Sequence, residues 1–481
     1  MHPYLVLSLL IGYFLILIGI SWLTSRNANT TTFFTANRKS PWLLVAFGMV
    51  GASLSGVTFI SVPGEVYNSA FSYLQFVMGN IIGYWLVAGV LLPLYYKLNL
   101  VSIYSFLDQR FGIKSYKTGS FFFLISKLIG ASFRLYLVAG VLQIAFFNSF
   151  NIPFSITVAV TIGLIWIYTY KGGIKTIVWT DTLQTLFLIS AVIFTIIAIS
   201  QSLELNILTL ADRISNEPSS RIFFWDWKSE NNFFKQFIAG IFITIVMVGM
   251  DQDMMQKNLT CKNLKEAQKN MIVFSLSFLA AVFLFLCLGV LLLVFAGEMN
   301  IPVPVNTDDL YPLIAMNHLT LPVGIAFLLG ITAAAYSSAD SALTAMTTSF
   351  SVDFLNIDRH PEVKRKKVRT LVHLSFSLLL LVVILAFNAI SNESVVVAVF
   401  TVAGYTYGPI LGLFVFGMFS KRTVKDKWVP LIAVLAPLIS YFISRYSEVL
   451  FRGYRFGFEI LILNGMLTLA GLYFLSKRTK N

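Results

Sequence analysis

Apolar runs of about 20 residues recur along the whole 481-residue chain and constrain its fold more than any other feature. A helical run of this length spans the hydrocarbon core of a bilayer. The runs lack the alternating pattern of membrane barrel strands, so their backbone groups must be satisfied within helices. The sequence therefore predicts an all-α membrane protein with about thirteen transmembrane helices. The runs cover residues 4–24, 41–65, 70–96, 118–146, 152–170, 179–202, 233–250, 267–297, 320–350, 367–388, 395–419, 426–447 and 455–476.

The surplus of basic residues indicates the orientation of these helices. The chain has 35 Lys and Arg against 22 Asp and Glu, which gives a formal net charge of +13. If the N-terminus is outside, 26 of the 35 lie in segments on the inner side and seven lie on the outer side. This is the positive-inside pattern, so the charge does not indicate nucleic-acid binding. We expect a multi-pass protein of the plasma membrane, of the bacterial inner-membrane type, with the N-terminus outside and the C-terminus cytoplasmic.

The sequence does not favour an enzyme or a separate soluble domain. Cys261 and Cys287 form no CxxC motif, and the four His are scattered, so no cluster is present that would hold a catalytic metal. The longest segment between runs, 203–232, is too short for a core of its own. We expect a single membrane domain over residues 1–481 with no obligate protein partner. The lack of an output domain counts against a non-transporting membrane sensor.

A stripe of polar side chains runs through the ninth apolar run. A carboxylate at bilayer depth costs about 2.5–3.5 kcal/mol on insertion scales, and such groups mark ion or substrate pathways. The stripe therefore indicates transport. The alternatives are a serine-rich helix interface and, for the carboxylate, a structural ion pair. The side chains recur at three- and four-residue spacing and so share one helix face; they are Ser337, Asp340, Ser341, Thr344 and Thr348.

Two of the apolar runs are interrupted. In the second run, Gly48, Gly51 and Gly56 alternate with serines, and glycine frees backbone at bilayer depth. Near the end of the seventh run, Gly249 comes shortly before the polar segment 251–256. Broken helices in corresponding positions of two halves indicate an inverted-repeat transporter with its binding site at the breaks. Close packing of small residues against a neighbouring helix is the alternative interpretation.

Three further charged residues lie within or beside the runs. Asp181, near the inner end of the sixth run, is expected either to ligate a cation or to cap its helix. Lys127 and Arg134 share one face of the fourth run. Lys127 is close enough to the inner end for its ammonium to reach water, whereas Arg134 is deeper. We expect Arg134 to pair with a carboxylate or to contact an anionic substrate.

Taken in order, these motifs resemble the sodium:solute symporter family. The resemblance implies a LeuT-type fold with inverted five-helix repeats at 41–202 and 233–419. The peripheral helices would lie at 4–24 and 426–476. It also implies that inward movement of sodium drives solute uptake by alternating access. The motifs that carry the resemblance lie at 106–112, 172–184, 251–256, 337–341 and 408–413.

The resemblance also implies two cation sites. One sodium ion would be bound by the backbone carbonyls of Gly51, Leu54 and Ala334 and the hydroxyls of Ser337 and Ser338. A second cation site would contain Asp181, Asp340 and Ser341, as in the sialic acid symporters, although Asp340 replaces a serine of that group. The added carboxylate would strengthen the second site, convert it to proton coupling or pair with Arg134. The sequence leaves these three roles open.

For the substrate, the resemblance points to an anion. Ser55 and Thr58 match hydroxyls that hold the carboxylate of sialic acid in the sialic acid symporters, and Arg134 lies one turn after the position of their arginine. Tyr73 and Gln75 are expected near the same cavity, where packing explains them equally well. We therefore expect sodium-coupled import of a small polar solute, an organic anion such as a sialic-acid-like carboxylate. The alternatives are a proton-coupled symporter of the same fold and a non-transporting sensor.

Overall fold

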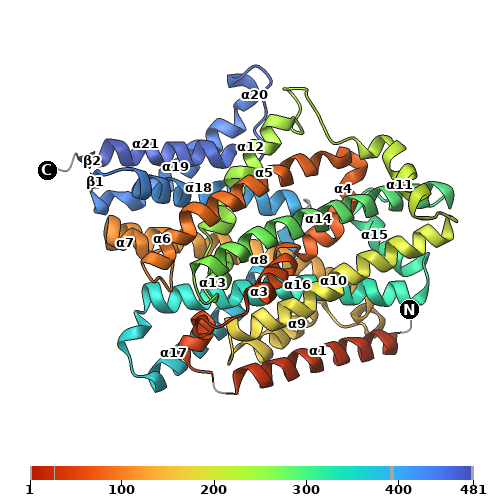
Figure 1. Cartoon of the computed structure of the whole chain (residues 1–481), viewed down its shortest axis with the longest axis horizontal. Helices are drawn as coiled ribbons and strands as arrows, with labels where there is room; N and C mark the ends of the chain where they lie inside the picture. The colour runs from red at the N-terminus through yellow and green to blue at the C-terminus, as the bar shows by residue number, and fades with distance from the viewer. Residues whose placement is uncertain (1–2, 27, 391–394, 478–481) are drawn as a thin grey trace.

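The computed structural model describes residues 3–26, 28–390 and 395–477, and most of them are helical (Figure 1). The helices before residue 220 are α1 (Pro3–Ser25), α2 (Thr30–Thr35), α3 (Trp42–Ser53), α4 (Gly56–Ser69), α5 (Tyr73–Leu86), α6 (Leu92–Lys97), α7 (Ser105–Arg110), α8 (Ile113–Ala145), α9 (Phe154–Thr169), α10 (Ile174–Ser202) and α11 (Ile207–Asn216). Those after it are α12 (Phe233–Thr244), α13 (Gln252–Asn258), α14 (Leu264–Glu298), α15 (Leu310–Asn317), α16 (Leu321–Ser349), α17 (Glu362–Ile390), α18 (Val395–Phe419), α19 (Val429–Arg445), α20 (Ser447–Leu450) and α21 (Ile460–Leu475). Two short strands, β1 (Thr423–Val424) and β2 (Ser476–Lys477), pair antiparallel.

One or two helices cover most of each predicted apolar run, which confirms the all-α prediction. Within the described residues, nine helices are long and apolar enough to cross a membrane, or ten if the bent pair of α12 and α13 forms one span. One of the nine is the stretch 56–97, which takes in parts of two predicted runs. The count of thirteen crossings therefore stays a prediction. Residues 478–481 of the predicted cytoplasmic tail lie outside the described part of the chain.

The first and last long helices lie at opposite edges of the molecule. In Figure 1, α1 runs along one edge beside α9 and α10, whereas α19 and α21 lie at the other edge with α18. Between these edges, α3, α10 and α16 pack against one another. Every residue of α16 from Gly330 to Ser349 is buried. The polar stripe of α16 is therefore enclosed by other helices.

Both predicted helix breaks are confirmed. α3 and α4 are separated by the non-helical residues Leu54 and Ser55. The second break follows Gly249, where a π-helical turn ends α12, and the axis of α13 is bent by 69° from it. Among the described residues, no hydrogen bond reaches the carbonyl oxygen of Gly51 or Leu54. The first break therefore leaves these two backbone oxygens unpaired in the interior, together with those of Ala52 and Ser53.

The glycines before the first break serve helix packing, so the alternative interpretation is correct for them. A Cβ added to Gly48 would lie 3.0 Å from Cβ of Asp181 on α10. A Cβ on Gly51 would lie 2.2 Å from Oγ1 of Thr185, to which the Gly51 N–H donates a hydrogen bond of 3.0 Å. The absence of side chains thus lets α3 approach α10 closely, next to Asp181.

Gly56 after the break has a different set of neighbours. Its missing Cβ would lie 2.4 Å from Cγ2 of Val138 on α8 and 3.8 Å from the backbone nitrogen of Ala335 on α16. The start of α4 is therefore in contact with α8 on one side and α16 on the other. The break lies where these two helices and α10 converge.

The contact between α5 and α12 depends on two glycines. A Cβ on Gly79 would lie 2.0 Å from the backbone oxygen of Phe237, and one on Gly240 would lie 2.1 Å from that of Phe76. Backbone oxygens in packed helices cannot move without separating the helices. We expect Gly240→Ala to lower the free energy of unfolding by about 1–3 kcal/mol, the usual cost of overpacking.

This loss can be measured as a lower melting temperature of the purified protein in detergent. Gly163→Ala in α9 is the matched control, because no atom lies within 4 Å of a Cβ at that position. Equal melting temperatures for the two variants would contradict the prediction.

Candidate functional site

Asp181 on α10 lies in a buried cluster of polar side chains and is only 1% exposed. The Nζ of Lys257, from α13, lies 2.7 Å from its Oδ2. From α16, the Oγ of Ser337 donates to Oδ1 at 2.6 Å, and the Oγ of Ser341 lies 3.5 Å from Oδ2. The carboxylate thus joins three helices that are distant in the sequence.

The capping role considered for Asp181 is wrong. α10 begins at Ile174 with Gly173 as its N-cap, so Asp181 is about two turns inside the helix. The apolar run begins later, at 179, because Lys175 and Thr176 lower the hydropathy of the first helical turns. Cation binding by Asp181 is the role that stays open.

Asp340 is fully buried on α16 and faces α9. Its Oδ2 accepts a hydrogen bond of 2.8 Å from the hydroxyl of Tyr168, and its Oδ1 accepts one of 3.2 Å from Ser341. No basic group in the described residues lies within ion-pair distance of this carboxylate. The expected ion pair of Asp340, with Arg134 or another cation, is therefore not formed. The predicted second-site residues Asp181, Asp340 and Ser341 do lie together.

The groups predicted to bind sodium lie on elements that pack against one another. The unpaired carbonyls of Gly51 and Leu54 belong to the break, and both α3 and α4 contact α16. On α16, the Oγ of Ser338 donates to the carbonyl oxygens of Ala334 and Ala335 at 3.2 and 3.0 Å. A hydroxyl that donates its proton in this way keeps its lone pairs for a cation. This donor set of carbonyl and hydroxyl oxygens is the kind that hard cations prefer.

Arg134 is half-buried on α8 and forms no ion pair within the part of the chain that the structure describes. Val138, one turn later on the same face, contacts Gly56 at the start of α4. Arg134 therefore shares the face of α8 that meets the broken span. A half-buried guanidinium with no carboxylate partner is suited to binding an anion.

The two predicted substrate hydroxyls lie at the start of α4. Ser55 is its N-cap residue, but its side chain makes no capping hydrogen bond. Thr58, one turn into α4, is half-buried. No hydrogen bond of either hydroxyl is found in residues 3–26, 28–390 and 395–477. Both hydroxyls are therefore available to a ligand near the break.

Gln75 and Tyr73 have packing contacts at the start of α5. The Nε2 of Gln75 donates to the backbone oxygen of Asn231 at 2.9 Å, and its Oε1 accepts from the N–H of Phe224 at 3.1 Å. The ring of Tyr73 is stacked on Phe76 with 5.5 Å between centroids. The amide of Gln75 holds the segment before α12 against α5. This is the packing explanation that the sequence left open for these two residues.

A second cluster of buried charges lies at the second break. The Nζ of Lys127 lies 3.2 Å from Oδ1 of Asp251 and 2.9 Å from Oδ2 of Asp253. The hydroxyl of Tyr407, on α18, also donates to Asp251. Lys127 is 7% exposed, so the expectation that its ammonium reaches water is wrong. The carboxylates of the polar segment 251–256 neutralise it inside the protein.

Sequence reasoning missed the role of Lys257. It was counted among the basic residues of an inner segment, whereas the structure places it in α13 with 1% exposure. The available signal was its position directly after the polar segment 251–256 at a predicted helix break. Charge counting alone could not separate it from the solvated lysines that follow.

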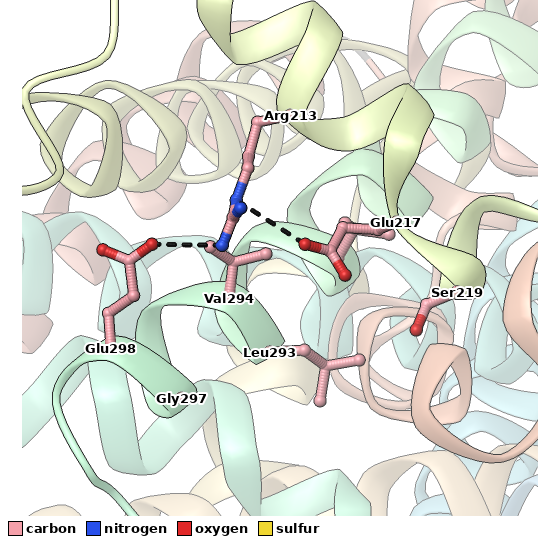
Figure 2. Close-up of a pocket in the computed structure, with 8 residues that line it drawn as sticks. Arg213, Glu217, Ser219, Leu293, Val294, Gly297 and Glu298 are labelled. Atoms are coloured by element: carbon pink, nitrogen blue, oxygen red, sulfur yellow. Dashed lines mark hydrogen bonds and ion pairs between the residues drawn. The ribbon is translucent and has the colours of Figure 1, made fainter.

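A surface pocket of about 260 Å³ lies away from these clusters, between α11 and α14 (Figure 2). Its Arg213 lies between two carboxylates, 3.5 Å from Glu217 and 3.2 Å from Glu298. Because both carboxylates engage the guanidinium, this arginine is a poorer anion site than Arg134.

Comparison with known proteins relates the chain to sodium-coupled transporters. A sequence model of the sodium:solute symporter family matches residues 33–426. A sodium/sialic acid symporter of Aliivibrio fischeri is 27% identical over 82% of this chain and 79% of its own length. One from Proteus mirabilis is 25% identical over 92% of this chain and 89% of its own length. The sodium/glucose cotransporter of Vibrio parahaemolyticus is 24% identical over 71% of this chain and 67% of its own length.

Solved structures show the same fold. A sodium-coupled sialic acid symporter aligns over 98% of this chain and 99% of its own, with a TM-score of 0.84 and 20% identity. A nucleobase-cation-symport-1 family transporter aligns over 93% of this chain and 95% of its own, with a TM-score of 0.55 and 14% identity. These likenesses show that the chain has a LeuT-like fold.

Proposed function

The chain belongs to the sodium:solute symporter family, and from this premise we propose that it imports a small organic anion together with sodium. The observation that carries the proposal is the break between α3 and α4, whose unpaired carbonyls belong to helices that pack against α16 and against the face of α8 that carries an arginine without a carboxylate partner. Two relatives that match most of the chain are sodium/sialic acid symporters, which supports a carboxylate as substrate. The proposed mechanism is alternating access.

Sodium is the coupling ion of the family. We assign it to the carbonyls of the first break and to the facing turn of α16. The hydroxyl of Ser337 is oriented by Asp181, and that of Ser338 by the backbone of its own helix. The proposed ligands are Gly51, Leu54, Ala334, Ser337 and Ser338.

The proposed substrate site is on the other side of the break. Arg134 supplies the positive charge for a carboxylate, with two donor hydroxyls nearby on α4, those of Ser55 and Thr58. Gln75 and Tyr73 are not assigned to it, because their contacts hold the start of α5. Sodium and substrate would thus share the broken helix, which is how the binding of one can strengthen the binding of the other.

The proposed architecture has thirteen crossings, with five-helix repeats at 41–202 and 233–419 and the N-terminus outside the plasma membrane. Its support is that the first helix of each proposed repeat is broken, between α3 and α4 and between α12 and α13. The peripheral helices are α1, α19 and α21, which lie at the edges in Figure 1.

The test of this function is a substrate screen followed by uptake. Purified protein is heated with organic acids, sugars and amino acids in Na⁺ and in K⁺, and ligands that raise the melting temperature only in Na⁺ are selected. We expect an acid to be selected and to accumulate in proteoliposomes when a sodium gradient is imposed. Ligand binding without sodium-driven accumulation would support the sensor alternative instead.

Ser338→Ala removes a proposed sodium ligand. We expect the sodium concentration for half-maximal uptake to rise about tenfold, which corresponds to about 1.4 kcal/mol of lost binding. The matched control is Thr344→Val on the same helix, because the hydroxyl of Thr344 has no hydrogen-bond partner in the described structure. An unchanged sodium requirement in Ser338→Ala would remove this residue from the site.

Arg134→Ala removes the proposed partner of the substrate carboxylate. We expect the variant to lose anion binding and uptake, while Arg134→Lys keeps weak binding because it retains the charge without the two-pronged hydrogen bond. The melting temperature without substrate should change little, since no ion pair is lost. Retained affinity in Arg134→Ala would leave the residue only a structural role.

Asp340→Asn tests the charge near the sodium site. We expect sodium affinity to fall about tenfold, because a negative charge close to a bound cation stabilises it. Tyr168→Phe is the control, since it removes one hydrogen bond to Asp340 and keeps the charge. Loss of pH dependence with an unchanged sodium requirement would support the proton-coupled alternative. If Asp340→Asn keeps the sodium dependence and the pH dependence of the wild type, Asp340 has only a packing role.

A further inference from the structure

The carboxylate expected to hold a second cation already has a cation of the protein next to it. Lys257 is 1% exposed, and its Nζ lies 2.7 Å from Oδ2 of Asp181. The same oxygen is 3.5 Å from the hydroxyl of Ser341, and the other oxygen accepts from Ser337. The ammonium therefore lies among the oxygens from which a second cation site was expected.

We infer that the ammonium of Lys257 takes the place of a second coupling cation, so that this transporter binds one sodium ion. The inference rests on the proposed function and specifies its ion stoichiometry. A sodium ion at Asp181 would have to displace the ammonium or share the carboxylate with it. Displacement would leave a buried ammonium unpaired, and sharing would bring two positive charges together in a low-dielectric interior.

The formal charges of the cluster agree with one sodium ion. If Asp253 of α13 is left with its own partner Lys127, Asp181 and Asp340 contribute two negative charges and Lys257 one positive charge, so one further monovalent cation makes these three groups neutral. That cation is the sodium at the adjoining break, next to Ser337 and Ser338. A second sodium would leave these three groups with a net positive charge.

The position of Lys257 explains how its ammonium can take the place of a bound cation. It is carried by α13, the short helix after the second break, which is bent by 69° from α12. After the bend, α13 packs against both α10 and α16, and Lys257 lies near its C-terminal end. An unbroken α12 would have continued past Asp181 instead of delivering a side chain to it.

The test counts sodium ions on the purified protein with radioactive Na⁺ alone, without any substrate. We expect one ion per chain in the wild type and one in Lys257→Arg. Lys257→Met uncovers Asp181 and should bind two. The double variant Lys257→Met with Asp181→Asn removes both charges and should return to one.

Two ions in the wild type, or one ion in a folded Lys257→Met, would overturn the inference. If Lys257→Met does not fold, the comparison of the wild type with Lys257→Arg and the double variant decides the question, because two ions in the wild type and one in the double variant would show that Asp181 holds sodium. No sodium binding in the wild type would instead overturn the proposed function. The two failures are therefore distinguishable.

Discussion

Every buried backbone oxygen needs a partner, and this requirement determines where the fold is suited to bind a ligand. A continuous helix satisfies its own carbonyls, and a bilayer offers no water to those that are left over. The break at Leu54 and Ser55 leaves the oxygens of Gly51 and Leu54 without a donor in the described structure. The fold keeps these oxygens in its interior, on helices that pack against α16. The sodium ion proposed for this site would satisfy them without a hydrogen-bond donor.

The buried charges follow the same rule of compensation. Lys257 is paired with Asp181, and Lys127 with Asp251 and Asp253. In the described residues, each pair connects one of the broken or bent elements to a long helix. The rule has exceptions in the described residues: Arg134, Lys235 and Arg369 form no ion pair with a carboxylate, and Asp340 and Asp353 form none with a basic group. An uncompensated charge at this depth is costly to retain unless a ligand neutralises it during function.

The sequence predicted the elements of this arrangement better than their pairings. Hydropathy located the helices, and glycine clustered with serine or polar residues located both breaks, because these signals are local. The partner of Lys127 lies 124 residues away at Asp251, and that of Asp181 lies 76 residues away at Lys257. No local pattern reports such contacts. Lys257 was assigned to a loop because hydropathy cannot show that a short polar helix turns back into the protein.

The hydropathy of the sequence also did not predict where α10 begins. The helix begins at Ile174, before its apolar run, and this displacement excludes the capping role of Asp181. A carboxylate at the first turn would have been stabilised by the helix dipole and by free N–H groups. Two turns inside the helix, neither is available. The compensation must then come from other helices, which is why the ammonium of Lys257 and the hydroxyl of Ser337 lie there.

A built-in cation changes the energetics of uptake as well as the ion count. A fixed ammonium returns with the protein in each cycle and moves no net charge, whereas a second sodium ion would add the work of its gradient and of the membrane potential. The potential supplies about 2.3 kcal/mol per 100 mV for each net charge moved. One sodium with one monovalent anion moves no net charge, so the potential would not drive accumulation. A tenfold sodium gradient alone is worth about 1.4 kcal/mol and supports about tenfold accumulation. With Lys257 in place of a second sodium ion, the driving force for uptake of a monovalent anion would thus be independent of the membrane potential.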